Sequence, residues 1–328
     1  MRKTRLVSNA DRLKLCLTGH DYLYKELSIN TPNVDISHIK EKLPFRLFGA
    51  VFGYDGGYIK LTDIERSTKG ESEAVMIEAE LHVDGLAYPY ATITTDRAFM
   101  YLTVSNRVFY DPLTTVGGKK ISLLAILPNI LEALHLEIHS VAAVDICVDG
   151  NINLRKHILK TLKDDSLVPI VNGLAIIDKR KPIQGYLKIY EGSRTGQVGK
   201  PSLYFKSEHI VINCYNKLRE LKAQGGTKDY IIDYNGWGQK GKMHRLEVRS
   251  KSAPIKTFCR SECISYMQFL VNLSDEAFRY RLFEWLTDKV LHFNTVEAYE
   301  KHKCDRRTLL HIAIRGVAPI SEAKPSER

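Results

Sequence analysis

The sequence predicts an α+β fold, in which a central antiparallel β-sheet is flanked by helices and followed by a helical C-terminal region. The first half of the chain is rich in β-branched and aromatic segments separated by turn-forming pairs, as in an antiparallel meander. The segment Met243–Arg249 alternates strictly between polar and apolar residues, which is typical of a strand. From about Ser252 the apolar residues take helical spacing. We therefore expect two units, an α+β domain at 1–251 and a helical region with a frayed tail at 252–328.

The N-terminal segments combine one strand with shorter elements. Asp11–Thr18 alternates polar and apolar residues and predicts a half-buried strand. Asp21–Ile29 and Ile36–Lys42 have the character of short helices. Gly53–Gly57 forms the turn of a predicted hairpin, and the charged stretch Arg66–Glu73 is expected to be an exposed loop.

A denser β-region follows, and then helices and strands alternate. The meander is predicted to comprise Val75–Val83, Tyr88–Thr95, Phe99–Val104 and Arg107–Tyr110. Later strands are expected at Val141–Val148, Pro169–Ile177, Gln184–Glu191, Leu203–Phe205 and Ile210–Tyr215. Helices are expected at Ile121–Leu136, Leu154–Asp164, Asn216–Ala223, Pro254–Leu273, Ser274–Val290 and Thr295–Ile314, with Ser274 as an N-cap and a loop at Ala223–Gln239.

The composition indicates a nucleic-acid partner and an ordinary reducing compartment. The formal net charge of +10 over 328 residues favours a polyanion and salt-dependent binding. Six cysteines in a chain of this length do not form a disulfide scaffold. There is no secretory signal, and no apolar run approaches the ~18–20 residues that cross a bilayer. We expect a cytoplasmic protein without membrane contact.

Tyr215 lies where a predicted strand meets a predicted helix. The backbone N–H groups at a helix N-terminus favour an anion such as phosphate, and Lys217 and Arg219 follow directly. A tyrosine in this place could attack a phosphodiester. It could equally be a strand residue that packs at a sheet edge, because tyrosine is common in strands.

Three carboxylates lie on predicted strands. Asp145 and Asp149 are four residues apart and share one face of their strand. Buried carboxylates need a partner or a metal, and Mg²⁺ or Mn²⁺ prefers oxygen ligands of this kind. Asp149 could instead end the strand at its turn. Glu247, between Arg245 and Arg249, is either part of an ion-pair ladder or a metal ligand beside a phosphate-binding surface.

Three segments, in order, resemble one family. They are V-D-I-C-V-D at Val144–Asp149, S-L-Y-F-K-S-E-H-I-V-I-N-C-Y-N-K at Ser202–Lys217, and H-R-L-E-V-R at His244–Arg249. Together they resemble the rolling-circle replication initiators of small plasmids and filamentous phages, the replication initiation factor or Rep_trans group, related to the HUH nickases. The resemblance implies a nickase whose tyrosine attacks a DNA phosphate, stays linked to the 5′ end and releases a 3′ hydroxyl.

Carried over by position, the resemblance assigns a role to each candidate. It implies that Tyr215 is the nucleophile and that Lys217 steadies the phosphate. Divalent Mg²⁺ or Mn²⁺ would be held by Asp145, Asp149 and Glu247. The residues expected to contact DNA are Arg245, Arg249, Arg219 and Lys206. The chain departs from the family pattern at Lys206, Glu208 and Cys214, and Tyr204 and Tyr190 are alternative nucleophiles.

The sequence thus predicts a metal-dependent, single-tyrosine DNA nickase and strand-transferase that initiates rolling-circle replication. Its partner would be single-stranded or hairpin origin DNA, with a host helicase and a second copy of the chain as further candidates. Two alternatives remain open at this point. One is a non-catalytic protein that binds an origin or other nucleic acid, and the other is a metallonuclease that uses water.

Overall fold

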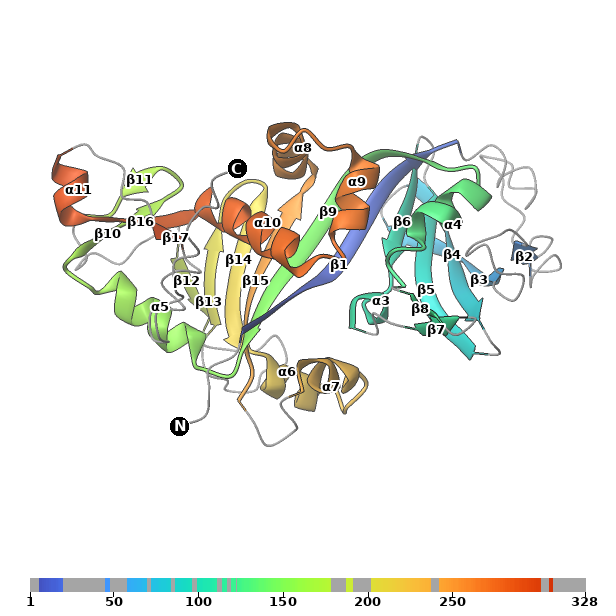
Figure 1. Cartoon of the computed structure of the whole chain (residues 1–328), viewed down its shortest axis with the longest axis horizontal. Coiled ribbons are helices and arrows are strands. Elements are labelled where there is room, and N and C mark those ends of the chain that lie inside the picture. The colour runs from blue at the N-terminus through green and yellow to red at the C-terminus, as the bar shows by residue number, and fades with distance from the viewer. Residues whose placement is uncertain are drawn as a thin grey trace.

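The structure is a computed structural model, and it describes residues 6–19, 45–47, 58–69, 72–83, 86–95, 99–110, 114–116, 119–121, 123–177, 187–190, 202–236, 242–301 and 307–308. Within these residues the main feature is an eleven-stranded antiparallel sheet (Figure 1). In sheet order its strands are β12 (Leu187–Tyr190), β13 (Ser202–Lys206), β14 (Ile210–Asn216), β15 (His244–Lys251), β9 (Glu137–Gly150), β1 (Leu6–Thr18), β6 (Met100–Val104), β5 (Leu86–Thr95), β4 (Ser72–Val83), β3 (Tyr58–Lys69) and β2 (Phe45–Leu47).

Smaller sheets and helices surround this sheet. A four-stranded sheet has the order β11 (Leu174–Ala175), β10 (Leu167–Val171), β16 (Leu291–Thr295) and β17 (Arg307–Thr308), and β7 (Thr114–Val116) pairs with β8 (Lys119–Ile121). The described helices are α3 (Arg107–Tyr110), α4 (Leu127–Ala133), α5 (Leu154–Leu162), α6 (Lys217–Ala223), α7 (Tyr230–Asn235), α8 (Ser252–Ser261), α9 (Tyr266–Asn272), α10 (Glu276–Asp288) and α11 (Val296–Glu300). None of these helices combines the length and hydrophobicity needed to span a bilayer.

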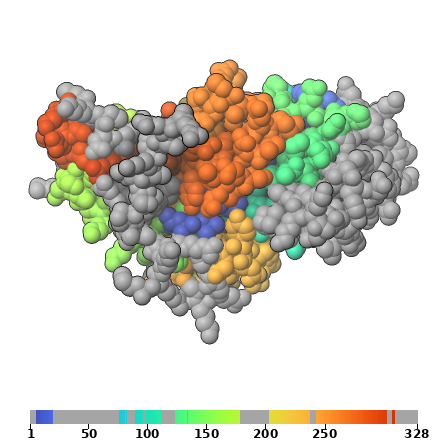
Figure 2. Space-filling model, viewed as in Figure 1, coloured from blue at the N-terminus to red at the C-terminus, as the bar shows by residue number. Residues whose placement is uncertain are grey.

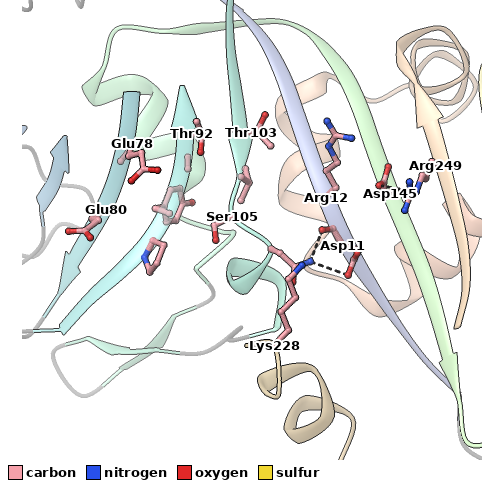
Figure 3. Close-up of a pocket in the computed structure, with 16 residues that line it drawn as sticks. Asp11, Arg12, Glu78, Glu80, Thr92, Thr103, Ser105, Asp145, Lys228 and Arg249 are labelled. Atoms are coloured by element: carbon pink, nitrogen blue, oxygen red, sulfur yellow. Dashed lines mark hydrogen bonds and ion pairs between the residues drawn. The ribbon is translucent and has the colours of Figure 1, made fainter. Parts of the chain in front are cut away.

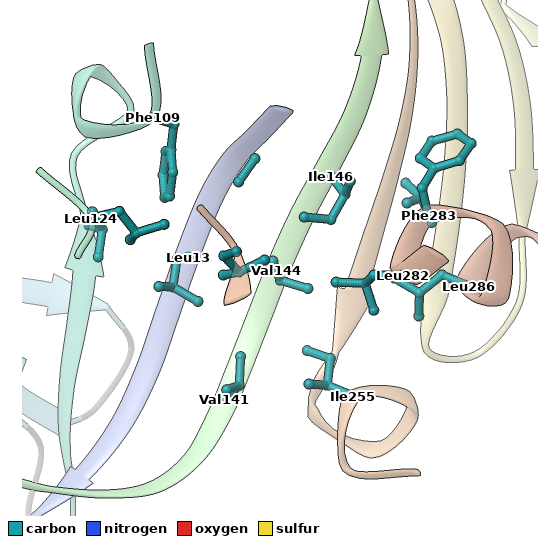
Figure 4. Packing of buried hydrophobic residues seen from close by; sticks show 14 of the residues in the cluster. Leu13, Phe109, Leu124, Val141, Val144, Ile146, Ile255, Leu282, Phe283 and Leu286 are labelled. Atoms are coloured by element: carbon teal, nitrogen blue, oxygen red, sulfur yellow. The ribbon is translucent and has the colours of Figure 1, made fainter. Parts of the chain in front are cut away.

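The period-two alternation of the central strands gives the sheet one apolar and one polar face. Val144 and Ile146 of β9 are fully buried, and they face Ile255 of α8 and Leu282 of α10 (Figure 4). Each such side chain contributes about 1.5–3 kcal/mol when it is removed from water. The C-terminal helices form the orange surface across the centre of the space-filling view (Figure 2). They leave the opposite face of the sheet to the polar residues.

Short polar caps fix where the helices beside the sheet begin. The side chain of Asn153 accepts a hydrogen bond from the Lys156 N–H and starts α5. Asn216 does the same for the N–H of Arg219 at the start of α6, immediately after β14. Asp275 caps α10, so the predicted N-cap at Ser274 was wrong by one residue.

The predicted fold class is confirmed, as are the strand–helix junction after Tyr215 and the strand at Met243–Arg249. Other predictions were wrong. Arg107–Tyr110 is helix α3. The N–H of Val108 donates a hydrogen bond to the carbonyl of Ser105, and the helical turn buries Val108, Phe109 and Tyr110 in the core. In the predicted loop Arg66–Glu73 the described residues 66–69 belong to β3 and residues 72–73 belong to β4, because cross-strand pairing outweighs their polar composition.

The remaining corrections concern segments whose structure depends on distant partners. The predicted loop Ala223–Gln239 contains α7, and the predicted helix Ile121–Leu136 is helical only at Leu127–Ala133. Within the predicted helix Thr295–Ile314 the structure describes residues 295–301 and 307–308, which hold the short α11 and the strand β17, and β16 before α11 pairs with β10. The predicted helices at Asp21–Ile29 and Ile36–Lys42 and the turn at Gly53–Gly57 lie outside the described residues.

The C-terminal helices share one hydrophobic core with the sheet. Arg279 of α10 is buried, and its guanidinium donates hydrogen bonds to the carbonyl of Ser8 in β1 at 3.0 and 3.2 Å. It also donates to the carbonyls of Leu273 and Ser274 at 2.8 and 2.9 Å. The chain position 251/252 coincides with the junction of β15 and α8. The division into two domains there stays a prediction.

Replacement of Arg279 should weaken this attachment. In Arg279→Ala the carbonyls of Ser8, Leu273 and Ser274 lose this donor, and we expect the free energy of unfolding to fall by about 2–4 kcal/mol in urea titrations. Arg260→Ala removes an exposed arginine from α8 and should change it by less than about 0.5 kcal/mol. Equal effects of the two substitutions would contradict a structural role for Arg279.

Candidate active site

The register of the central strands brings most of the predicted site residues to one face of the sheet. Tyr215 of β14 lies opposite Arg245 of β15, which lies opposite Asp149 of β9. Four residues further along β15, Arg249 lies opposite Asp145 of β9. Glu247 sits between the two arginines on the same face of β15, since side chains alternate along a strand. We call this surface the polar face, and it also includes Asp11 of β1, which is described in a later paragraph.

Arg245 is the centre of the first cluster on the polar face. It is fully buried, and its Nε and Nη2 donate to the two oxygens of Asp149 at 2.7 Å each. Its Nη1 donates to Oδ1 of Asp11 at 2.7 Å, and Nη2 also donates to the hydroxyl of Tyr110 in α3 at 2.7 Å. Both carboxylates are therefore held by one guanidinium in a low-dielectric setting.

Asp11 reaches this cluster because of a bulge in β1. Ala10 pairs with Ile146 and Arg12 pairs with the adjacent Asp145, so Asp11 is the extra residue. Burial alone would raise the pKa of Asp11, but Arg245, Lys217 and hydrogen bonds from Tyr110 and Asn106 hold it well below its usual range. Its carboxylate is thus ionised at neutral pH and serves as a counter-ion.

The second cluster joins Tyr215, Glu247, Arg249 and Asp145. The hydroxyl of Tyr215 donates to Oε2 of Glu247 at 2.7 Å. The Nε of Arg249 donates to the other oxygen of Glu247 and lies 3.5 Å from Oδ2 of Asp145. The side chain of Glu247 is 1% exposed, whereas that of Arg249 is 54% exposed. Arg249 therefore covers two buried carboxylates and can move away from them into solvent.

Two groups in this cluster, the Asp145 carboxyl and the Tyr215 phenol, have raised pKa values. Burial, and next the charge of Glu247, raise the pKa of Asp145 to about 7. Burial, and then Glu247, raise the pKa of the Tyr215 phenol well above its usual value. The phenol is consequently neutral at pH 7 and needs a base if it is to act as a nucleophile. Glu247 is the base within hydrogen-bonding distance.

The other predicted residues are placed around these clusters. The ammonium of Lys217 is buried, 2.9 Å from Oε2 of Glu220 and 5.8 Å from the centre of the Tyr215 ring. Arg219 lies on the exposed side of α6, and Lys206 is exposed at the end of β13. The sheet thus brings together Tyr215, Lys217, Glu247 and the two arginines, while Arg219 and Lys206 remain peripheral.

The donor set fits a divalent cation in part. In the described stretches of the chain, no three or more His, Cys, Asp or Glu side chains are grouped closely enough to hold a metal. Asp149 is turned toward Arg245, away from the other two predicted ligands. Mg²⁺, however, commonly takes one or two protein carboxylates together with water and substrate phosphate, which Asp145 and Glu247 could supply. The metal requirement stays a prediction.

Comparisons with known proteins add a distant likeness of fold. No family model and no curated protein matches the chain. Among solved structures, a rolling-circle replication initiator protein from Geobacillus stearothermophilus is similar, with a TM-score of 0.42 and 15% sequence identity over 94% of this chain and 96% of that one. A likeness this distant carries no residue or activity over to this chain.

Sequence reasoning missed the residues that support Arg245. Asn106 donates to Asp11 at 3.0 Å and accepts from the hydroxyl of Tyr230 in α7 at 2.8 Å. Asn235 of α7 donates to Asp149 at 3.3 Å. The one available signal was Asp11 itself, because strict alternation places this charge in phase with the apolar Leu13, which predicts a bulge.

The raised pKa of Asp145 predicts a pH-dependent cost in stability. A carboxyl with a pKa of 3.8 in the unfolded chain and about 7 in the folded protein stabilises the fold at low pH and loses that contribution as pH rises through 7. At pH 8 Asp145→Asn should therefore be more stable than the wild type by about 1–3 kcal/mol in chelator-containing buffer.

The difference should shrink toward zero as the pH falls to about 4, since both proteins then carry a neutral side chain. Urea titrations across this pH range measure it, and Asp165→Asn, which changes an exposed aspartate outside the site, is the control. If Asp145→Asn is no more stable than the wild type at pH 8, the charge of Asp145 does not reduce the free energy of unfolding.

Proposed function

We propose that this chain initiates rolling-circle replication by nicking DNA and transferring a strand through Tyr215. The observation that carries the proposal is the 2.7 Å hydrogen bond from the Tyr215 hydroxyl to Glu247, beside Asp145 and Arg249 on the polar face. A phenol paired with a carboxylate base, next to a half-exposed arginine in a chain of net charge +10, suits attack on a DNA phosphate. The ordered resemblance of three sequence segments supports the same activity.

In the proposed step the Tyr215 oxygen attacks the phosphorus of one phosphodiester. A bond forms between this oxygen and phosphorus, and the bond from phosphorus to the 3′ oxygen breaks. The phenol proton passes to Oε2 of Glu247, and the departing 3′ oxygen takes a proton from water. The products are a 5′-phosphotyrosine and a free 3′ hydroxyl. Because one phosphodiester replaces another, the reaction needs no nucleotide cofactor.

Asp145 and Glu247 are the proposed ligands of Mg²⁺ or Mn²⁺. When bound, such a cation neutralises charge on the scissile phosphate. Arg249, which is exposed and spans both carboxylates, would turn to a phosphate oxygen as DNA enters. Asp149 would act indirectly by orienting Arg245. Lys217 places a positive charge behind the Tyr215 ring, and this charge would favour the phenolate as it forms.

The first test is a search for a covalent adduct. Wild-type protein, Mn²⁺ and a random-sequence single-stranded DNA library are expected to give a protein-linked DNA band on a denaturing gel. Tyr215→Phe should lose that band, whereas Tyr204→Phe, a conservative change on the neighbouring strand β13, should retain it. Cleavage without an adduct would indicate a metallonuclease that uses water. DNA that is retarded but never cut would indicate a binding protein.

Replacement of Glu247 separates the base from the nucleophile. In Glu247→Gln the acceptor for the phenol proton is lost, and we expect the rate of adduct formation to fall about 10²–10⁴-fold. Retention of the DNA by the variant in a filter-binding assay would show that binding survives. Glu208→Gln alters an exposed glutamate between β13 and β14 and serves as the matched control. Equal rates of adduct formation in wild type and Glu247→Gln would rule out Glu247 as the base that accepts the Tyr215 proton.

A further inference from the structure

The polar face continues beyond the site as a strip of basic side chains. Lys251 of β15 pairs with Ala143 of β9, which pairs with Lys14 of β1, so these three residues share one face of the sheet. Arg12 lies on the same face of β1, two residues before Lys14 and opposite Asp145. We call Arg12, Lys14 and Lys251 the basic strip.

The basic strip begins at the candidate site and leads away from it. Arg12 lines a cavity of about 570 Å³ together with Asp145 and Arg249, and Figure 3 shows these three residues on the neighbouring strands β1, β9 and β15. Lys14 lies about 7 Å further along β1, since a strand rises about 3.4 Å per residue. Arg12 and Lys251 are exposed, and Lys14 is partly exposed.

Two carboxylates lie beside the near end of the strip, and each has an arginine as its partner. Oδ1 of Asp11 is 2.7 Å from the buried guanidinium of Arg245. Oδ2 of Asp145 is 3.5 Å from Nε of Arg249. These arginines offset the two negative charges, so the charge of the strip itself is not cancelled there.

The other carboxylates near the strip are distant or balanced. From Lys14 the row of paired residues passes through a threonine of β6 and one of β5 to Glu78 of β4. Three strand-to-strand steps amount to about 14 Å, which exceeds the Debye length of about 8 Å at physiological ionic strength. Beyond Lys251, the exposed Glu208 of the β13–β14 turn is balanced by the exposed Lys206. The strip therefore keeps a local excess of positive charge.

An aromatic ring lies at the far end of the strip. Tyr101 of β6 pairs with Cys16 of β1 and so shares the face of Lys14. Its neighbours Met100 and Leu102 are buried on the opposite face, whereas Tyr101 is partly exposed. The ammonium of Lys14 lies 4.3 Å from the centre of the Tyr101 ring. Basic side chains beside an aromatic ring are the combination that binds single-stranded nucleic acid.

We propose that the basic strip and Tyr101 bind the single strand of DNA on one side of the phosphate that is cut. In this arrangement Lys14 and Lys251 contact backbone phosphates, and one base stacks on the ring of Tyr101. The inference rests on the proposed function and gives the strand a path to Tyr215. A base can stack on a tyrosine only when it is unpaired, so this surface selects single-stranded DNA over duplex DNA.

The contact between Lys14 and Tyr101 does not prevent stacking. An exposed cation–π contact is worth about two- to fivefold in an equilibrium constant. A base stacked on an aromatic side chain is worth about 5- to 150-fold by alanine substitution. The base therefore displaces the ammonium of Lys14 from the ring, and the ammonium can then pair with a phosphate of the same strand.

The first test measures the phosphate contacts without cleavage. Fluorescence anisotropy gives the affinity of Tyr215→Phe protein for labelled oligothymidylate of about 20 nucleotides, which exceeds the ~4–16 nucleotides that one single-strand-binding domain contacts. In Tyr215→Phe/Lys14→Gln/Lys251→Gln we expect binding about 10- to 25-fold weaker at about 0.1 M salt. The slope of log K against log salt should become shallower by about 1.4, because each phosphate contributes about 0.7.

A matched control separates these contacts from net charge. Tyr215→Phe/Lys160→Gln/Lys256→Gln removes the same charge from exposed positions on α5 and α8 and should leave the slope unchanged. Equal losses of slope in the two lysine pairs would overturn the strip, as would duplex DNA that binds as tightly as the single strand or failure to bind either DNA.

The second test measures stacking with an abasic oligonucleotide, which keeps the phosphates and lacks the bases. We expect Tyr215→Phe to prefer oligothymidylate, and Tyr101→Leu in this background should reduce the preference about fivefold or more. Tyr101→Phe keeps the ring and should keep the preference, as should Tyr299→Leu on α11. Tyr101→Thr replaces Tyr101→Leu should that variant fail to fold, because threonine suits a strand. A preference that Tyr101→Leu leaves unchanged would overturn the stacking contact.

The adduct assay on wild-type protein separates this inference from the function on which it rests. Losses of slope and base preference as expected, with no adduct from any DNA, would sustain the strip and overturn nicking through Tyr215. An adduct in wild type, with strip variants that bind DNA as the Tyr215→Phe protein does, would do the reverse.

Discussion

The buried guanidinium of Arg245 is the interaction on which the polar face depends. A fully buried arginine is tolerated only where its charge and its donors are satisfied, and Asp149 and Asp11 supply both from β9 and β1. The same group binds Tyr110 of α3, and Asn106 links Asp11 to Tyr230 of α7. The Arg245 side chain thus links β15 to β9 and β1 of the same sheet and to helix α3. Tyr215 lies directly opposite Arg245 on the next strand.

The carboxylates of the polar face fall into two classes because their partners differ. Asp11 meets a buried, fully engaged arginine, and its pKa lies well below the usual range. Asp145 meets another carboxylate and an arginine that is half in solvent, and its pKa rises to about 7. Environments that separate similar groups in this way are common where a protein performs acid–base or metal chemistry. The first cluster stabilises the fold, whereas in the second the charged form of Asp145 costs stability.

The parts that sequence could predict are those set by local patterns. Alternation placed Asp145 and Asp149 on one face, and the change from alternating to helical spacing placed Tyr215 at a junction. The Asp11 bulge, the helical turn at Arg107–Tyr110 and the pairing of β16 with β10 depend on contacts between segments distant in the chain. Apart from the phase of Asp11 relative to Leu13, no local pattern contains that information. The pairing of Asp149 with Arg245 is another contact between strands, and the predicted role of Asp149 as a metal ligand stays a prediction.

Charge acts at two distances in this molecule. The net charge of +10 attracts a polyanion from solution, yet the polar face concentrates carboxylates at the place where a phosphate would react. Long-range attraction of this kind acts on any polyanion and does not decide where the polyanion lies. Position must come from short-range pairing, and on the polar face Arg249 is a half-exposed cation that lies against the buried carboxylates of Asp145 and Glu247. The polar face therefore gathers the Tyr215 hydroxyl, the buried carboxylates of Asp145 and Glu247 and the half-exposed Arg249 on one sheet.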